Sequence, residues 1–201
     1  RTAISADSTA SSIGNETSPS LTFSFTLRNG ESAVLEKYIS YAFNEHESKT
    51  NASVFASSGF AHAVLEQKTY LAEFWETAQM KIGGSFKDEQ AVNCNLFHLL
   101  QSAGKDGSVS IAAKGLTAEG YEGHFFWDTE AYVCPVFTYI QPAIARALLS
   151  YRAHILPLAQ ERARELSLQG ALFPWRTISG HETSAYYPAG TAQYHIDADI
   201  M

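Results

Sequence analysis

The stretch that decides how this chain folds is GLTAEGYEGHFFWDTE, residues 115–130. Its glycines interrupt a short loop, and the loop then delivers Trp127 and Asp128 side by side. Such a pair suits a sugar, because the C–H face of the ring packs on an indole while the hydroxyls donate hydrogen bonds to a carboxylate. The pair predicts a sugar-binding position. The alternative is structural, since Asp128 also stands where a helix is expected to begin and Asp is a favoured N-cap.

A second segment, GALFPWRTISG at residues 170–180, repeats this combination of aromatics, glycine and a charge. The repeat makes Trp175 a second candidate for packing on a sugar ring. The alternative is that Trp175 packs in the core against Phe173. Trp127, Asp128 and Trp175 are therefore expected to converge on one side of the folded chain.

The region that contains both segments reads as mainly α-helical. Helices are predicted from about Lys87 onward, with later starts after Asp128, after Pro142, near Pro157 and near Thr191. Long glycine-rich loops between helices are unusual unless they carry function. The loops, rather than the helices, are therefore the predicted place of the site.

The N-terminal part has a different pattern. The first twenty residues are rich in Ser and Thr and read as a loop. Apolar and polar residues alternate over 21–27, Asn29-Gly30 follows as a turn, and alternation returns over 35–43, which together predict a β-hairpin. Two strands are not stable alone in water, so they are expected to belong to a larger sheet.

One helix is predicted between these parts, capped by Ser57-Ser58 and ended by Gly83-Gly84.

Glu130 is expected in a first helical turn, where a negative charge suits the helix dipole. His98 and His154 lie in apolar helical stripes and are predicted to be core histidines. A run of charges is interpreted as solvated helix faces: Arg146, Arg152, Glu161, Arg162, Arg164 and Glu165.

Composition excludes several classes of function. The 201 residues carry a net charge of −7 and no cluster of Lys and Arg, which argues against binding to nucleic acid. No apolar run is long enough to cross a membrane. The two cysteines are too few for a thiolate zinc site, and His195 and Asp199 share a helix face without a third ligand nearby, so no metal is expected.

Several longer stretches resemble glycoside hydrolase family 65, the inverting phosphorylases and hydrolases of α-linked glucose disaccharides. They are residues 97–101 (FHLLQ), the 115–130 loop, residues 173–177 (FPWRT) and residues 184–199 (SAYYPAGTAQYHIDAD). The resemblance implies part of an (α/α)6 barrel catalytic domain over residues 86–201. It also implies a linker helix over 57–85 and the end of an N-terminal β-sandwich over 1–56. Family members are several times longer, so the chain is expected to be a fragment.

The same resemblance assigns roles to residues. It places Trp127, Asp128, Trp175 and Arg176 at the substrate. It implies no catalytic residue here, because the family's general acid, a Glu, would lie beyond Met201. Arg176 stands where phosphorylases of maltose typically carry Glu. The Arg-Thr-Ile form, with residues 184–187, instead resembles trehalose- and nigerose-type phosphorylases and fungal acid trehalases.

The reaction implied is inverting phosphorolysis of an α-glucosidic disaccharide to β-glucose 1-phosphate, with inorganic phosphate as co-substrate and no other cofactor. Two alternatives stay open: hydrolysis by an enzyme of the acid-trehalase type, and a non-catalytic sugar-binding relative. The family implies a homodimer for the full-length protein. It also implies a cytoplasmic location for a phosphorylase, or a secreted or vacuolar one for an acid trehalase.

Overall fold

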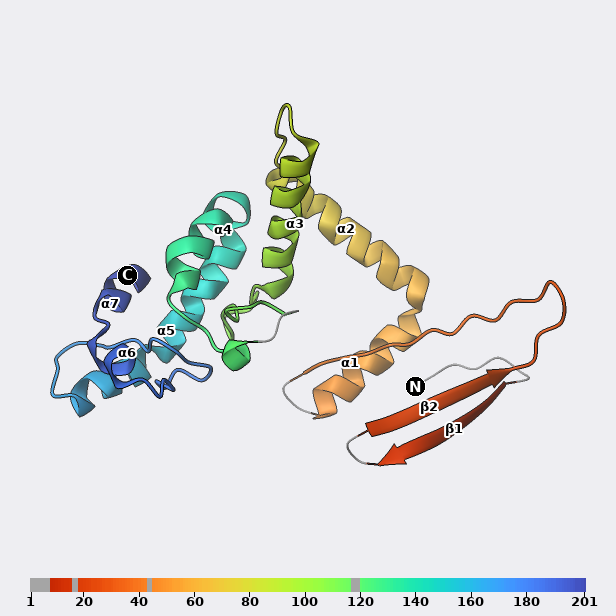
Figure 1. Cartoon of the computed structure of the whole chain (residues 1–201), viewed down its shortest axis with the longest axis horizontal. Coiled ribbons are helices and arrows are strands. Elements are labelled where there is room, and N and C mark those ends of the chain that lie inside the picture. The colour runs from red at the N-terminus through yellow and green to blue at the C-terminus, as the bar shows by residue number, and fades with distance from the viewer. Residues whose placement is uncertain (1–7, 16–17, 43–44, 117–119) are drawn as a thin grey trace. The chain divides into compact units, whose positions relative to one another are not determined.

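The computed structural model describes residues 8–15, 18–42, 45–116 and 120–201 of the chain. The elements are β1 (Ser8–Asn15), β2 (Ser18–Phe25), α1 (Glu45–Ser58), α2 (Phe60–Ala78), α3 (Phe86–Ser102), the 3-10 helix η1 (Tyr121–Gly123), the π-helix η2 (Thr129–Val133), α4 (Cys134–Ile140), α5 (Pro142–Glu165), α6 (Tyr187–Ala192) and α7 (His195–Ile200) (Figure 1). The fold is mainly α, as predicted. The chain divides into two compact units, residues 1–72 and 73–201.

The first unit contains one antiparallel pair of strands. β1 and β2 pair so that Ser8 lies opposite Phe25 and Asn15 lies opposite Ser18. The strand predicted over 21–27 is confirmed up to Phe25, as part of β2. Its partner is β1, which comes before it in the sequence, and not a strand that comes after it. Residues 31–42 form no strand, so the predicted hairpin with 35–43 is wrong over the described residues. The reading of residues 8–15 as a loop is also wrong, because backbone hydrogen bonds can build a ladder from Ser and Thr without an apolar stripe.

The helix predicted from Ser57 also starts differently. Ser57 and Ser58 end α1 rather than cap the next helix, and their hydroxyls donate to the carbonyl oxygens of Ser53 and Val54 at 2.7 and 3.1 Å. Gly59 has a φ of +83° and separates α1 from α2, the left-handed conformation that glycine supplies after a helix. α1 itself was not predicted.

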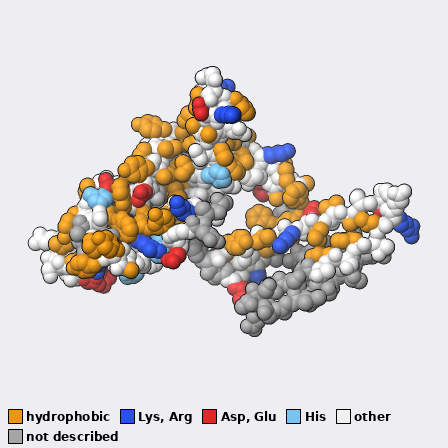
Figure 2. Space-filling view, viewed as in Figure 1, with side chains coloured by type: hydrophobic (Ala, Val, Ile, Leu, Met, Phe, Trp, Pro, Cys, Tyr) orange, Lys and Arg blue, Asp and Glu red, His pale blue; other side chains and the backbone are white. Residues whose placement is uncertain are grey.

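Apolar side chains remain at the surface of the first unit. Of residues 22–42 and 45–72, none is buried. Val34 is 80% exposed, Tyr41 93% and Leu65 62%. Hydrophobic side chains are visible over much of the face drawn in Figure 2. The sheet described here has two strands, and the larger β-sandwich expected around it stays a prediction.

The second unit has a well-defined core. Phe74, Phe137 and Leu148 are almost fully buried. A second cluster joins α5 and α7 to the loops between helices; its buried members are Phe125, Tyr151, Ile155, Ala159, Phe173, Ile196 and Ile200. α4 packs against α5, and α7 packs against η2. The loops of the site thus rest directly on the core.

α5 is longer than predicted. It begins at Pro142, as expected for a proline at the first helical position, but it runs through Pro157 to Glu165. The separate helix predicted near Pro157 is therefore wrong. A proline inside a helix costs about 3 kcal/mol, and burial of Ile155 and Ala159 on either side of it offsets that cost. Among the described residues, no helix is both long and apolar enough to span a bilayer.

Candidate functional site

Two short bridges between loops organise the site. Phe125 pairs antiparallel with Ala112 on one side and with Thr177 on the other. The Phe125 amide donates to the Thr177 carbonyl at 2.7 Å, and the Thr177 amide donates back at 3.1 Å. Trp127 follows Phe125 by two residues and Trp175 precedes Thr177 by two, so this bridge brings the two tryptophan-bearing segments together.

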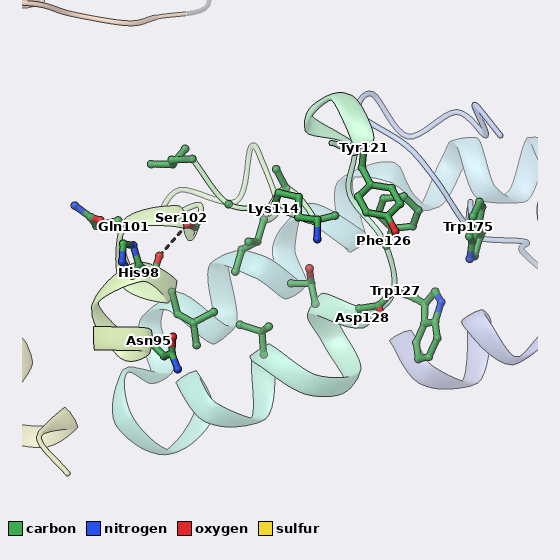
Figure 3. Close-up of a pocket in the computed structure, with 18 residues that line it drawn as sticks. Asn95, His98, Gln101, Ser102, Lys114, Tyr121, Phe126, Trp127, Asp128 and Trp175 are labelled. Carbon is green, nitrogen blue, oxygen red and sulfur yellow. Dashed lines mark hydrogen bonds between the residues drawn. The ribbon is translucent and has the colours of Figure 1, made fainter. Parts of the chain in front are cut away.

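The bridged loops and the C-terminal end of α3 enclose a cavity of about 860 Å³ (Figure 3). That volume lies within the usual range for small-molecule sites, about 300–1,000 Å³. Trp127, Asp128 and Trp175 all line this cavity. The convergence expected from the sequence is therefore present.

Aromatic rings beside Trp175 form part of the cavity wall. Phe126 meets Tyr121 edge to face at 5.3 Å between ring centroids and meets Trp175 in the same manner at 5.2 Å. Tyr121 and Glu122 both have a φ of +52°, in the left-handed region that side chains other than Asn and Gly rarely adopt. This strained turn, η1, sets the Tyr121 ring at the cavity.

Asp128 is exposed, and among the described residues that line the cavity it is the one carboxylate. Its own backbone is helical, at φ −52° and ψ −31°, and its side chain makes no capping hydrogen bond. The structure therefore does not support the alternative in which Asp128 caps the helix. Both carboxylate oxygens remain able to accept hydrogen bonds from a ligand.

Trp127 is half-buried, and its ring is held from the side by α7 and η2. It contacts the His195 ring edge to face at 4.9 Å and Tyr132 at 5.9 Å. The His195 Nδ1 is 2.7 Å from an Asp199 carboxylate oxygen, which orients the imidazole. No group of three or more potential metal ligands occurs in the described part of the chain.

Trp175 is fixed through its backbone by a local carboxylate. Its amide donates to Glu182 at 2.6 Å, and the Ser184 amide donates to the same carboxylate at 2.8 Å. The Trp175 side chain packs on Phe126 and against the buried cluster that contains Phe173, and it also lines the cavity. Core packing and a place at the cavity therefore do not exclude one another.

Arg176 does not line the cavity in this structure. Its Nη2 pairs with Glu122 of η1 at 2.9 Å, and its side chain is 24% exposed. Arg176 thus ties the loop that follows α5 to the strained turn beside Tyr121. Its expected contact with substrate stays a prediction.

The structure adds cavity residues that sequence reasoning did not assign: Asn95, His98, Gln101, Ser102, Lys114 and Tyr121. His98 is exposed at the cavity rather than buried, so its prediction as a core histidine is wrong. His154 is also exposed, and its Nδ1 lies 3.0 Å from the Gly107 carbonyl oxygen. The sequence held one sign that His98 belongs to the site, namely its position within residues 97–101, one of the stretches that resemble the family.

The interpretation of Arg152 as a solvated side chain is also wrong. Arg152 pairs with Glu130 at 2.7 Å, and their side chains are only 3% and 2% exposed. Arg152 Nη2 donates a second hydrogen bond, to the Phe126 carbonyl at 3.1 Å. The expectation that Glu130 is structural fits this contact, although its partner is a side chain on α5 rather than a helix dipole.

Residues 93–201 match the central catalytic domain of glycosyl hydrolase family 65. The chain therefore belongs to this family, and its helices fit part of an (α/α)6 barrel. It is 48% identical over 180 residues to an α,α-trehalose phosphorylase of Thermoanaerobacter brockii, covering 86% of this chain and 23% of the relative. It is 60% identical over 136 residues to an α,α-trehalose phosphorylase of Geobacillus stearothermophilus, covering 67% of this chain and 18% of the relative.

Less similar relatives are named for another disaccharide, kojibiose. A kojibiose phosphorylase of Escherichia coli is 42% identical over 144 residues, covering 64% of this chain and 19% of the relative. A solved structure described as a candidate kojibiose phosphorylase from the human microbiome superposes with a TM-score of 0.71 at 31% identity, over 77% of this chain and 21% of that one. The chain thus spans about a fifth of the length of the relatives it matches.

Proposed function

We propose that this chain supplies the glucose-binding half of an inverting α-glucoside phosphorylase. The complete protein would convert a disaccharide and inorganic phosphate to β-glucose 1-phosphate and a released sugar. One observation carries the proposal: two tryptophans and a free carboxylate from separate loops line one cavity in a domain of this family.

The preferred disaccharide in this proposal is trehalose. The two α,α-trehalose phosphorylases are 48% and 60% identical to the chain, against 42% for the kojibiose phosphorylase of Escherichia coli. Arg176 argues against maltose, because the form of the loop that contains it resembles trehalose- and nigerose-type phosphorylases and acid trehalases. Arg176 and its partner Glu122 each follow a residue that lines the cavity, Trp175 and Tyr121, which supports a role for this charge in the choice of the second sugar.

Each residue of the site has a defined task in this reaction. Trp127 and Trp175 offer apolar faces to the glucose ring. Asp128 accepts hydrogen bonds from glucose hydroxyls, and charged hydrogen bonds of this kind are the strong ones. The bound ring is thereby held with its anomeric carbon in a fixed place for attack.

Proton transfer falls to a residue outside this chain. Inversion requires an acid that protonates the leaving oxygen and a nucleophile on the opposite face of the ring. Phosphate is already nucleophilic, so no catalytic base is needed. Asp128 is committed to the sugar hydroxyls in this proposal, and the acid is the Glu expected beyond Met201. As the family resemblance implies, the complete protein is also proposed to be a homodimer in the cytoplasm.

The experiment is to incubate the complete protein with trehalose, with and without inorganic phosphate, and to identify the products. β-Glucose 1-phosphate and glucose in equal amounts, formed only with phosphate, are expected. Two glucose molecules per trehalose without phosphate would instead make the protein a hydrolase. Trehalose binding without turnover would make it a sugar-binding relative. Kojibiose, nigerose and maltose in parallel reactions test the choice of disaccharide.

A further inference from the structure

One buried ion pair holds both ends of the segment that carries Trp127 and Asp128. Arg152 Nη2 donates to the carbonyl oxygen of Phe126 at 3.1 Å and to the carboxylate of Glu130 at 2.7 Å. Phe126 immediately precedes Trp127, and Glu130 follows Asp128 by two residues. A single nitrogen on α5 therefore fixes the start and the end of the turn that presents both ligand-facing side chains.

The neighbouring residue of α5 holds the other half of the site. The Tyr151 ring meets Phe125 edge to face at 5.4 Å between centroids. Its hydroxyl donates to the Ile178 carbonyl at 3.2 Å, just beyond the residue that pairs with Phe125. Tyr151 and Arg152 thus connect one turn of α5 to both tryptophan-bearing segments.

The ion pair is poorly explained as a source of stability alone. Moving two charges out of water carries a desolvation penalty that the mutual attraction often only balances, and well-packed apolar replacements are frequently as stable. In the described residues, Arg152 Nε, Arg152 Nη1 and Glu130 Oε1 have no hydrogen-bond partner. The pair does fix the position of Glu130 relative to Arg152, because charged hydrogen bonds constrain the geometry of the atoms they join.

The backbone next to the pair is itself unusual. Glu130 lies in η2, a five-residue π-helix over Thr129–Val133. Single π-turns occur frequently at functional sites, because their wider turn re-aims neighbouring side chains. The amides of Glu130 and Ala131 both donate to the Trp127 carbonyl, at 3.0 and 3.2 Å. The turn therefore transmits the position of Glu130 to Trp127.

We propose that Arg152 and Glu130 are positioning residues for the reaction, which set the place of Trp127 and Asp128 against the glucose ring. This inference rests on the proposed phosphorolysis. Displacement of a substrate-positioning group by about 1 Å can lower a rate by about 100-fold. Loss of the pair should therefore damage catalysis even where the protein remains folded.

The test compares two double variants in the complete protein. Glu130→Met with Arg152→Met removes both buried charges together, so neither is left unpaired. Arg162→Met with Glu165→Met removes an ion pair on the same helix that is 3.1 Å long but exposed, with side chains 30% and 57% accessible. Melting temperature, kinetics with trehalose and phosphate, and amide hydrogen exchange at Glu130 and Ala131 are measured for each.

The buried double variant should melt cooperatively, with kcat/KM for trehalose reduced about 10- to 100-fold. Its KM for trehalose should rise while its KM for phosphate stays the same, because the change lies at the sugar. The surface variant should match wild type. A merely structural role would lower the fraction of active enzyme and leave both KM values alone. Unchanged kinetics in a folded buried variant, or a fall in kcat with both KM values unchanged, would overturn the proposal.

Two further measurements apply if the double variant does not fold or if wild type is inactive on trehalose. If the buried double variant does not fold, Arg152→Lys replaces it, since Lys keeps the charge but not the geometry; wild-type kinetics in that variant would overturn the proposal. If wild type does not phosphorolyse trehalose, the proposed function fails. The positioning role is then judged by hydrogen exchange alone: faster exchange at Glu130 and Ala131 supports it, and unchanged exchange overturns it.

Discussion

The two segments that carry the tryptophans of the cavity are held in place by different means. The segment with Trp127 depends on Arg152, a side chain on α5 that reaches both of its ends. The segment with Trp175 depends on Glu182, only seven residues away, which accepts backbone hydrogen bonds from Trp175 and Ser184. The first segment therefore depends on a charged contact from a distant helix. The second takes its charged contact from its own loop, and α5 reaches it through the neutral hydrogen bond from Tyr151 to Ile178.

The largest effect should follow removal of the guanidinium alone. Arg152→Met leaves the Glu130 carboxylate buried and unpaired, which is expected to destabilise the protein by about 3–5 kcal/mol. Arg162→Met is the matched control, because its partner Glu165 is exposed and such pairs contribute about 0–1 kcal/mol. Urea unfolding of both variants makes the comparison. Equal losses would mean that Glu130 finds another partner and that the first segment does not depend on α5.

Asp128→Asn should have the next largest effect, on catalysis rather than on stability. The change keeps the shape of the side chain but removes the charge that accepts hydrogen bonds from glucose hydroxyls. Charged hydrogen bonds contribute about 1.5–3 kcal/mol, so kcat/KM on the best disaccharide should fall about 10- to 150-fold. Asp88→Asn on the exposed first turn of α3 serves as the control. Wild-type kinetics for Asp128→Asn would remove this residue from the site.

Arg176→Glu should change preference more than overall activity. It replaces the pair with Glu122 by two like charges and changes none of the residues that line the cavity. The ratios of kcat/KM among trehalose, kojibiose, nigerose and maltose are expected to shift. Exchanging both charges, as Glu122→Arg with Arg176→Glu, separates a role through the pair from direct contact with substrate. If the exchanged variant has the kcat/KM ratios of wild type, Arg176 acts through its pair with Glu122. If the ratios remain shifted, Arg176 acts by direct contact with the substrate.

The smallest effect concerns Asp197, which accepts a hydrogen bond from the Phe173 amide at 2.9 Å. Burial raises the pKa of Asp197 above its ordinary value of 3.8. The folded protein then binds the carboxyl proton more tightly than the unfolded chain does. The contribution of Asp197 to stability therefore falls as the pH rises from the pKa of the unfolded chain through the raised pKa of the folded protein. Asp197→Asn keeps an acceptor without a charge. Its melting temperature relative to wild type should be higher at pH 7 than at pH 3, and the reverse order would contradict this.

The sequence predicted what depends on local pattern. The helical second unit, the start of α5 at Pro142 and the convergence of Trp127, Asp128 and Trp175 follow from apolar spacing, proline chemistry and the family resemblance. The strand β1 escaped prediction because Ser and Thr give no alternating apolar signal. The helix break expected at Pro157 is absent because tertiary burial on both sides of it outweighs the lost hydrogen bond.

The support of the site could not be predicted because it depends on partners far apart in the sequence. Arg152 lies in a run of charges with helical spacing, and only the folded chain brings Glu130, 22 residues earlier, within 2.7 Å. His98 likewise sits in an apolar stripe, yet the cavity leaves it exposed. In both cases periodicity identifies the element correctly but not which of its side chains is buried.

A double-mutant cycle on the two tryptophans tests most directly whether the two segments form one sugar site. Trp127→Ala, Trp175→Ala and the double variant are compared by kcat/KM on trehalose with phosphate, in the complete protein. Residues that share one ligand are expected to couple by about 0.5–3 kcal/mol, so the double variant should lose less than the product of the two single losses. Strictly multiplicative losses would contradict a shared site, and wild-type activity in either single variant would contradict it outright.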